Sequence, residues 1–162
     1  YTKAEMRQAR DMLEYAIRLE SAGDVVARRF TVLAGDYHDT GHELSADGLA
    51  ELTRMYEDIM AHFKLAANVL LSNDPESARL LSLEKTEIKR LERQSRKRHL
   101  KRLQNGMSNS LETSDIHLEC LRAMREFNGH MSAVAYPILY QTGQLLETRL
   151  SEDYPNQLAE QS

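Results

Sequence analysis

Residues 45–75 read SADGLAELTRMYEDIMAHFKLAANVLLSNDP, and this stretch decides the class of fold. Ser45 is a good helix cap, and Asp47 in the first turn suits the positive end of a helix. Apolar residues then recur three or four positions apart, which predicts an amphipathic helix: Leu49, Leu52, Tyr56, Ile59, Phe63, Ala66 and Leu70. Asp74 and Pro75 open the next helix after a very short turn. Two antiparallel neighbouring helices are therefore expected.

The sequence before residue 45 predicts one long helix and a loop. The helix is expected from Lys3 to Leu33, with a buried apolar stripe: Met12, Ala16, Leu19, Gly23, Val26, Phe30 and Leu33. The loop is expected from Ala34 to Leu44, because it holds two glycines and three acidic residues.

The sequence after residue 75 predicts two more helices. One runs to about Leu103, and the other begins near Ser108 or Ser110. Pro137 should kink the last helix or mark its weakening. We therefore expect an all-α fold, an elongated antiparallel bundle of four long helices over residues 1–150, followed by a flexible tail over residues 151–162.

The composition favours a helical protein without disulfides or common enzyme motifs. The 162 residues include three Pro, seven Gly and no Trp, which favours helices. The single Cys120 excludes an internal disulfide framework and, on an apolar stripe, is expected to be a core residue. Phosphate-binding glycine loops, GxSxG and CxxC motifs are missing from the sequence. These absences argue against the common enzyme templates.

The most informative acidic pair is Glu20 and Asp24, in the stretch Arg18-Leu19-Glu20-Ser21-Ala22-Gly23-Asp24. A spacing of four places both carboxylates on one side of a helix, at the edge of the expected buried face. Their repulsion is offset by a cation, which is either a divalent or iron ion or a basic side chain such as Arg28. The pair is thus a candidate metal site.

Several histidines are weaker candidates. His38 and His42 lie four residues apart in the expected loop, beside three acidic residues, and such a set can hold a transition metal. A surface loop without metal is the simpler interpretation. His130 lies beside Met131 on a mostly apolar face, where a hydrogen-bonded core histidine is expected.

A basic segment dominates the third helix. Residues 85–102 contain nine Lys or Arg and only two Glu. The candidate contact residues for a partner or for acidic lipid headgroups lie in its second half: Arg93, Arg96, Lys97, Arg98, Lys101 and Arg102. The segment has no stacking aromatics and the rest of the chain is acidic, so nucleic acid is not expected as a partner. Pairing within the molecule, or a solvated surface, is the alternative.

These motifs together resemble a known family. The stretch from Arg18 to Asp24 resembles the helix signature of PhoU proteins, and the chain is most similar to the PhoU-like cytoplasmic domain of bacterial sodium-dependent phosphate cotransporters. The supporting residues are spread over about residues 10–145, in three stretches: Arg98-His99-Leu100-Lys101-Arg102-Leu103, Thr113-Ser114-Asp115-Ile116-His117-Leu118, and Asn128-Gly129-His130 followed by Ala133-Val134-Ala135-Tyr136-Pro137-Ile138-Leu139.

The resemblance implies a fold and a setting. PhoU domains consist of two three-helix repeats, so the first helix here is similar to the last helix of one repeat and the other three to a second repeat. The first two helices of the family are then missing from this chain. The implied role is regulation of phosphate transport at the cytoplasmic face of the bacterial inner membrane, which implies that the protein is not an enzyme. The implied partners are the transmembrane domain of the same polypeptide and, with the exposed apolar surface, a second copy in a homodimer.

The chain departs from the family at the second carboxylate signature. Arg125 stands where Glu20 stands in the first copy, and Gly129 stands where Asp24 stands. A multinuclear metal cluster is therefore not expected, and Arg125 is expected to face Glu20 or Asp24. Two alternatives remain open, which are a free-standing PhoU-type regulator and a metal-dependent helical-bundle enzyme.

Overall fold

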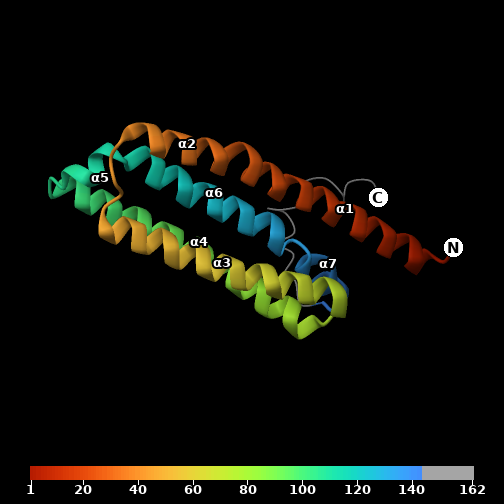
Figure 1. Cartoon of the computed structure of the whole chain (residues 1–162). Coiled ribbons are helices and arrows are strands. Elements are labelled where there is room, and N and C mark those ends of the chain that lie inside the picture. Colours follow the sequence, from red (N-terminus) through yellow and green to blue (C-terminus); the bar gives the residue numbers. More distant parts are fainter. Residues whose placement is uncertain (144–162) are drawn as a thin grey trace, which may run out of the picture.

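The computed structural model describes residues 1–143, and every regular element among them is helical. The helices are α1 (Lys3–Asp24), η1 (Val25–Phe30), α2 (Thr31–Thr40), α3 (Ala46–Ser72), α4 (Pro75–Gln104), α5 (Ser108–Glu112), α6 (Ser114–Ser132) and α7 (Ala135–Gln141). Figure 1 shows α3, α4 and α6 as one long bundle, with α1 and α2 along α6. The expected all-α class is confirmed, while residues 144–150 of the expected bundle and the whole of the expected tail over residues 151–162 lie outside the described residues.

Helices α3 and α4 form the expected antiparallel hairpin, and local caps explain its ends. The Ser45 side chain accepts a hydrogen bond from the Gly48 backbone amide at 3.1 Å, which starts α3. Asn73 ends α3 in the left-handed conformation, with a φ of 53°. Asp74 then caps α4 through the Ser77 amide at 2.8 Å, and Pro75 occupies the first turn.

The expected fourth helix is divided into three. Short α5 is followed by a break at Thr113, and α6 and α7 are separated at Ala133 and Val134. Proline at position 137 lies in the first turn of α7, where its missing amide costs no hydrogen bond. Pro137 therefore lies where a new helix begins. This agrees with the expected weakening of the long helix near this residue.

The first helix continues further than the sequence predicts. Figure 1 shows α1, η1 and α2 as one continuous rod, of which η1 is a π-helical segment. The expected loop over residues 34–40 is wrong, because Gly35 lies inside α2. A single glycine costs a helix only about 1 kcal/mol and does not end it. The end comes at Gly41, which takes the left-handed conformation with a φ of 63°.

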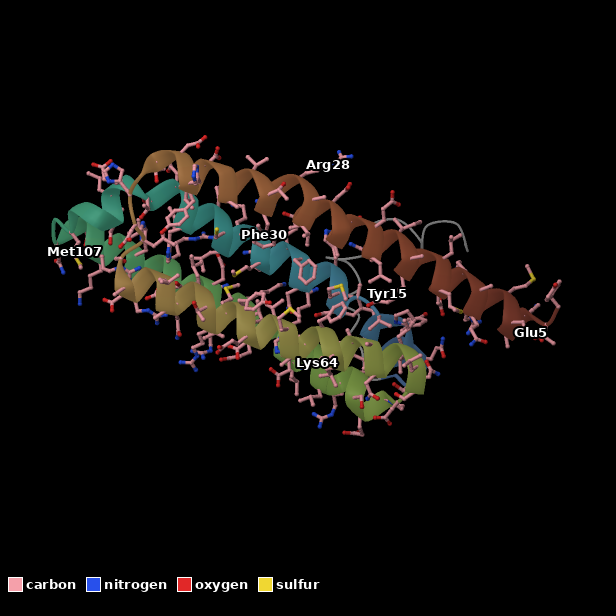
Figure 2. The ribbon with its side chains drawn as sticks, in the orientation of Figure 1. Glu5, Tyr15, Arg28, Phe30, Lys64 and Met107 are labelled. Carbon is pink, nitrogen blue, oxygen red and sulfur yellow. The ribbon has the colours of Figure 1, made fainter. Side chains whose placement is uncertain are left out.

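The expected buried stripe of the first helix is also wrong. The residues that α1 and η1 bury are Tyr15, Ala22 and Val25. Figure 2 shows Tyr15 pointing from α1 toward the rest of the bundle, and its hydroxyl donates to the Met131 carbonyl at 3.1 Å. Most of the expected stripe is exposed instead: Met12, Ala16, Leu19, Gly23 and Val26, which we call the α1 seam. Only Phe30 and Leu33, at its end, are half-buried.

The core of the bundle has two apolar clusters. The cluster near α7 includes Val69, Ala78, Leu81 and Ile138, and Leu81 is fully buried. The second cluster lies further along α3, α4 and α6 and includes Leu52, Ile59, Ile88 and Leu121. Beyond it, toward α5, the interior is built from polar side chains, which form the candidate site.

Candidate functional site

The site centres on Glu51, one turn beyond the start of α3. Its carboxylate accepts hydrogen bonds from Arg98 Nε at 2.7 Å and Arg102 Nη1 at 3.0 Å, and from the Ser95 hydroxyl. The side chains of Glu51 and Arg102 are only 12% and 9% exposed. Burial raises the pKa of the Glu51 carboxyl, but the bonds from Arg102, Ser95 and Arg98 outweigh it and hold that pKa below its usual value. Glu51 is thus a buried anion held by two cations.

Two stacked histidines lie beside this ion pair. The rings of His99 and His117 are 4.6 Å apart between centroids and nearly parallel, and both are almost fully buried. His99 Nε2 contacts the Ser114 hydroxyl at 2.8 Å, and His117 Nε2 lies 3.7 Å from Glu51 Oε2. Burial lowers the pKa of His117 to about 4, with a further contribution from the neighbouring His99. Both rings are therefore uncharged at neutral pH.

Close packing at Gly48 brings α3 against this histidine pair. A Cβ at position 48 would lie 3.2 Å from His117 Nδ1 and 2.9 Å from the Ser45 hydroxyl. Several buried polar atoms around it have no hydrogen-bond partner among the described residues: His99 Nδ1, both ring nitrogens of His117, Arg102 Nε and the Ser110 hydroxyl. Such a concentration of unpaired polar groups is costly, and it marks this end of the bundle as more than a stabilising core.

The Glu51 ion pair forms the wall of an open groove between α3 and α4. The groove has a volume of about 490 Å³. From α4 it is lined by Arg90, Gln94, Arg98 and Arg102, which are spaced four residues apart and so form one row along the helix. The facing residues of α3 are Asp47, Ala50, Glu51 and Arg54. Four guanidinium groups thus meet two carboxylates in one groove.

The six predicted contact residues of α4 divide into two groups. Arg96, Arg98 and Arg102 are bound within the molecule, Arg96 to the buried Glu92 and the other two to Glu51. The second group is exposed and has no ion pair within the described residues: Arg93, Lys97 and Lys101, which we call the α4 basic row. The structure therefore supports the internal-pairing alternative for half of the segment.

The expected partner of Arg125 is wrong. Arg125 Nη1 lies 3.4 Å from Glu92 Oε2 and so pairs with α4, whereas Asp24 pairs with Arg28 on its own helix, at 3.5 Å. Figure 2 shows Arg28 pointing away from the bundle. Glu20 and Asp24 are both exposed. The two carboxylates therefore lie outside the core, and not at the edge of a buried face.

The structure does not bring the predicted metal ligands together. Over residues 1–143, no three His, Cys, Asp or Glu side chains are grouped so that they could hold a metal ion. His38 contacts Asp39 at 3.2 Å, while His42 lies 3.8 Å from Glu112 of α5. His130 is half-buried near Glu126, and Cys120 is half-buried beside the second apolar cluster.

Sequence reasoning missed the residues of the polar cluster. Glu51, His99 and His117 come from three helices, and each one alone reads as an ordinary polar residue. A signal was present at His99, which occupies a position between Ser95 and Arg102 on the face that continues from Ile88 and Glu92. Polar residues on a core face indicate a buried polar network, but their partners cannot be found from spacing alone.

Comparison with known proteins identifies relatives in phosphate transport. The chain is 35% identical over 137 residues to the "Putative inorganic phosphate export protein YjbB" of Escherichia coli strain K12 and of strain O157:H7. The protein of the same name from Salmonella typhimurium is 33% identical over 140 residues. These matches cover 85% or 86% of this chain but only 25% or 26% of each relative. Neither a protein-family model nor a solved structure matches the chain.

The fold and these matches together define an all-α helical-bundle chain that is homologous to part of the phosphate export proteins. The chain spans about a quarter of the length of the relatives that it matches. The resemblance to a phosphate-transport family is therefore confirmed, because the chain is homologous to part of these proteins. In the part of the chain that the structure describes, no helix has both the length and the apolar character needed to cross a bilayer.

Proposed function

We propose that this chain is the regulatory part of a larger sodium-dependent phosphate transport protein, and that it acts through contacts with the rest of that protein at the cytoplasmic face of the membrane. The observation that carries the proposal is the match of 137 residues to a quarter of the length of phosphate export proteins. In this proposal the chain carries out no chemical reaction, and its helices are the last helix of one PhoU-like three-helix repeat followed by a second, complete repeat.

The α1 seam supports a contact with another helix. Its residues alternate at spacings of four and three, as in the seam of a coiled coil, yet they are exposed. Met12 is 59% exposed and Val26 is 45% exposed, and Leu13 and Ile17 extend the apolar surface beside them. An apolar face of this length is unfavourable in water. We therefore place a helix of the larger protein on it.

The carboxylate pair lies next to this contact. Glu20 and Asp24 flank Leu19 and Gly23 of the α1 seam, so a helix that covers the seam would also approach both carboxylates. A divalent or iron ion at this pair would need its remaining ligands from that helix. Metal analysis of the larger protein, with and without the Glu20→Gln substitution, tests this extension of the proposal.

The α4 basic row offers a second contact of a different kind. Arg93, Lys97 and Lys101 repeat every four residues along the outer side of α4, and like charges at this spacing repel one another. Acidic lipid headgroups or acidic loops of the larger protein would relieve that repulsion. Binding through this row should weaken as salt increases, because exposed charges are screened.

Co-purification tests the protein contact directly. The 162-residue chain is expressed together with the Escherichia coli K12 relative from which the matching region has been removed. We expect the two to co-purify, and Leu19→Glu in the α1 seam should lower recovery about fivefold or more, because it places a charge in an apolar contact.

Leu71→Glu is the matched control. Leu71 is 88% exposed at the end of α3, away from the seam, and the substitution introduces the same charge. Recovery should change by less than about twofold. A failure to co-purify, or equal losses with both variants, would contradict the proposed contact.

A further inference from the structure

The groove between α3 and α4 has the donors of an anion site. Arg90, Gln94 and Arg98 line it from one helix, and Arg54 lines it from the other. We propose that this groove binds a small anion that carries several phosphoryl groups, with Arg54, Arg90 and Arg98 as its ligands. The proposal concerns binding by this chain alone and does not depend on the regulatory role.

The balance of charge in the groove favours an anion. Arg98 and Arg102 both pair with Glu51, so these three side chains together carry one net positive charge. Arg90 is paired with Glu87, whose charge also acts on Arg54. Arg54 itself forms no ion pair within residues 1–143, so four guanidinium groups outnumber the carboxylates of Glu51, Glu87 and Asp47. Asp47 is the remaining acid of the lining, and it lies at the end of the groove nearest the start of α3.

The Glu51 pair also fixes the shape of the site. Arg98 donates through Nε to Glu51, which orients the guanidinium, while the side chain itself is 53% exposed. An arginine whose position is held by a carboxylate loses less freedom when it binds a ligand. Buried Arg102 and Ser95, which also line the groove, donate to the same carboxylate. The groove is therefore organised before a ligand arrives.

The distance between the arginines along α4 indicates the size of the ligand. Eight residues separate Arg90 from Arg98, which corresponds to about 12 Å along a helix. An anion with several phosphoryl groups can contact donors along the whole row at once, whereas a single orthophosphate would require the arginine side chains to converge on one point. Arginine binds phosphoryl oxygens through two parallel hydrogen bonds, which favours phosphate over a halide. The small Ala50 leaves room between the helices.

The first experiment compares two arginines of the same exposed character. Binding of tripolyphosphate to the 162-residue chain is measured by titration calorimetry without magnesium. Arg54→Gln should weaken binding about fivefold or more. Arg93→Gln makes the same change of net charge, but Arg93 belongs to the α4 basic row and does not line the groove, so binding should change by less than about twofold. Equal losses with both variants, or no binding at millimolar tripolyphosphate, would overturn the proposal.

A second variant tests the groove without changing its charge. Ala50→Phe fills the space between the helices, and residue 50 is exposed, so folding should be preserved and can be checked by circular dichroism. We expect binding of tripolyphosphate to be lost. Binding that survives in Ala50→Phe would mean a diffuse attraction to the basic helix and would overturn a site in the groove.

Competition identifies where the phosphoryl groups come from. Vesicles of phosphatidylglycerol that displace tripolyphosphate from the wild-type chain, but bind Arg54→Gln weakly, would assign the groove to lipid headgroups. Vesicles that leave tripolyphosphate bound would assign it to a soluble phosphorylated ligand. Vesicle binding that is equal in the wild-type chain and Arg54→Gln, together with no binding of tripolyphosphate, would contradict both sources.

Discussion

The two ends of the bundle share α3 and α4 but have interiors of opposite character. Toward α7, α3 and α4 enclose an apolar cluster in which Leu81 and Val69 are fully buried. Toward α5, the corresponding interior holds a carboxylate, an arginine and two stacked histidines. A core of hydrocarbon stabilises a fold without specifying any ligand, whereas a buried polar network positions charged groups at a cost in stability. The bundle therefore separates its apolar interior from its buried charged and polar groups along its length.

The largest effect is expected at the apolar end. Leu81→Ala removes a fully buried side chain and leaves a cavity, so the free energy of unfolding should fall by about 3–4 kcal/mol. Chemical denaturation measures this change. Leu83→Ala, at a position that is 51% exposed on the same helix, is the control and should leave stability nearly unchanged. A small loss for Leu81→Ala would mean that the apolar end is not the stable part of the bundle.

The polar end should respond to the loss of its central charge. Glu51→Gln leaves buried Arg102 without a counter-charge, and the free energy of unfolding should fall by about 2–3 kcal/mol. Glu87→Gln breaks the exposed pair with Arg90 and should have no measurable effect on chemical denaturation. If the two substitutions had equal effects, the burial of the Glu51 pair would contribute nothing, and the contrast between the two ends would fail.

Mild acid should weaken the polar end. His117 is held uncharged by burial, with its pKa lowered to about 4 from an ordinary value of 6.5, beside His99, Arg102 and Glu51. Between these two values the unfolded chain binds more protons than the folded chain, so stability falls as pH falls. From pH 7.5 to 5.5 we expect a loss of about 1.4 kcal/mol from this residue.

Removing the buried imidazole provides the test of that pH effect. In His117→Gln the difference in unfolding free energy between pH 7.5 and 5.5 should shrink by about 1.4 kcal/mol. His38→Gln is the matched control, because His38 is 90% exposed and should leave the difference unchanged. An unaltered pH dependence in His117→Gln would show that this histidine is not the group that titrates.

Local signals in the sequence predicted most of the helical architecture. Ser45, Asp74 and Pro75 act through neighbouring backbone groups, so the α3–α4 hairpin could be predicted with its caps. The prediction failed at residues 34–40, because Gly35 only weakens a helix whereas Gly41 takes the conformation that ends one. The helical spacing of the α1 seam was predicted, but its exposure was not. An apolar stripe along a helix does not show whether the surface that covers it belongs to the same chain.

The candidate site was beyond reach for a different reason. The basic segment of α4 was visible in the sequence, but spacing could not tell which of its residues turn inward. Arg98 and Arg102 are drawn to Glu51, which lies about fifty residues earlier in the chain. The choice between internal pair and free surface thus depends on a tertiary contact, and of the six predicted residues Arg93, Lys97 and Lys101 are those without an ion pair among residues 1–143.

Phosphate efflux from cells tests the regulatory role most directly. In the Escherichia coli K12 relative, the matching region is either deleted or replaced by this chain, and release of radioactive phosphate is followed after growth in low and in high phosphate. The proposed function predicts that both proteins export phosphate, and that only the protein carrying this chain changes its rate with phosphate supply. Loss of export on deletion, or a response to phosphate supply that persists without the region, would contradict a regulatory role.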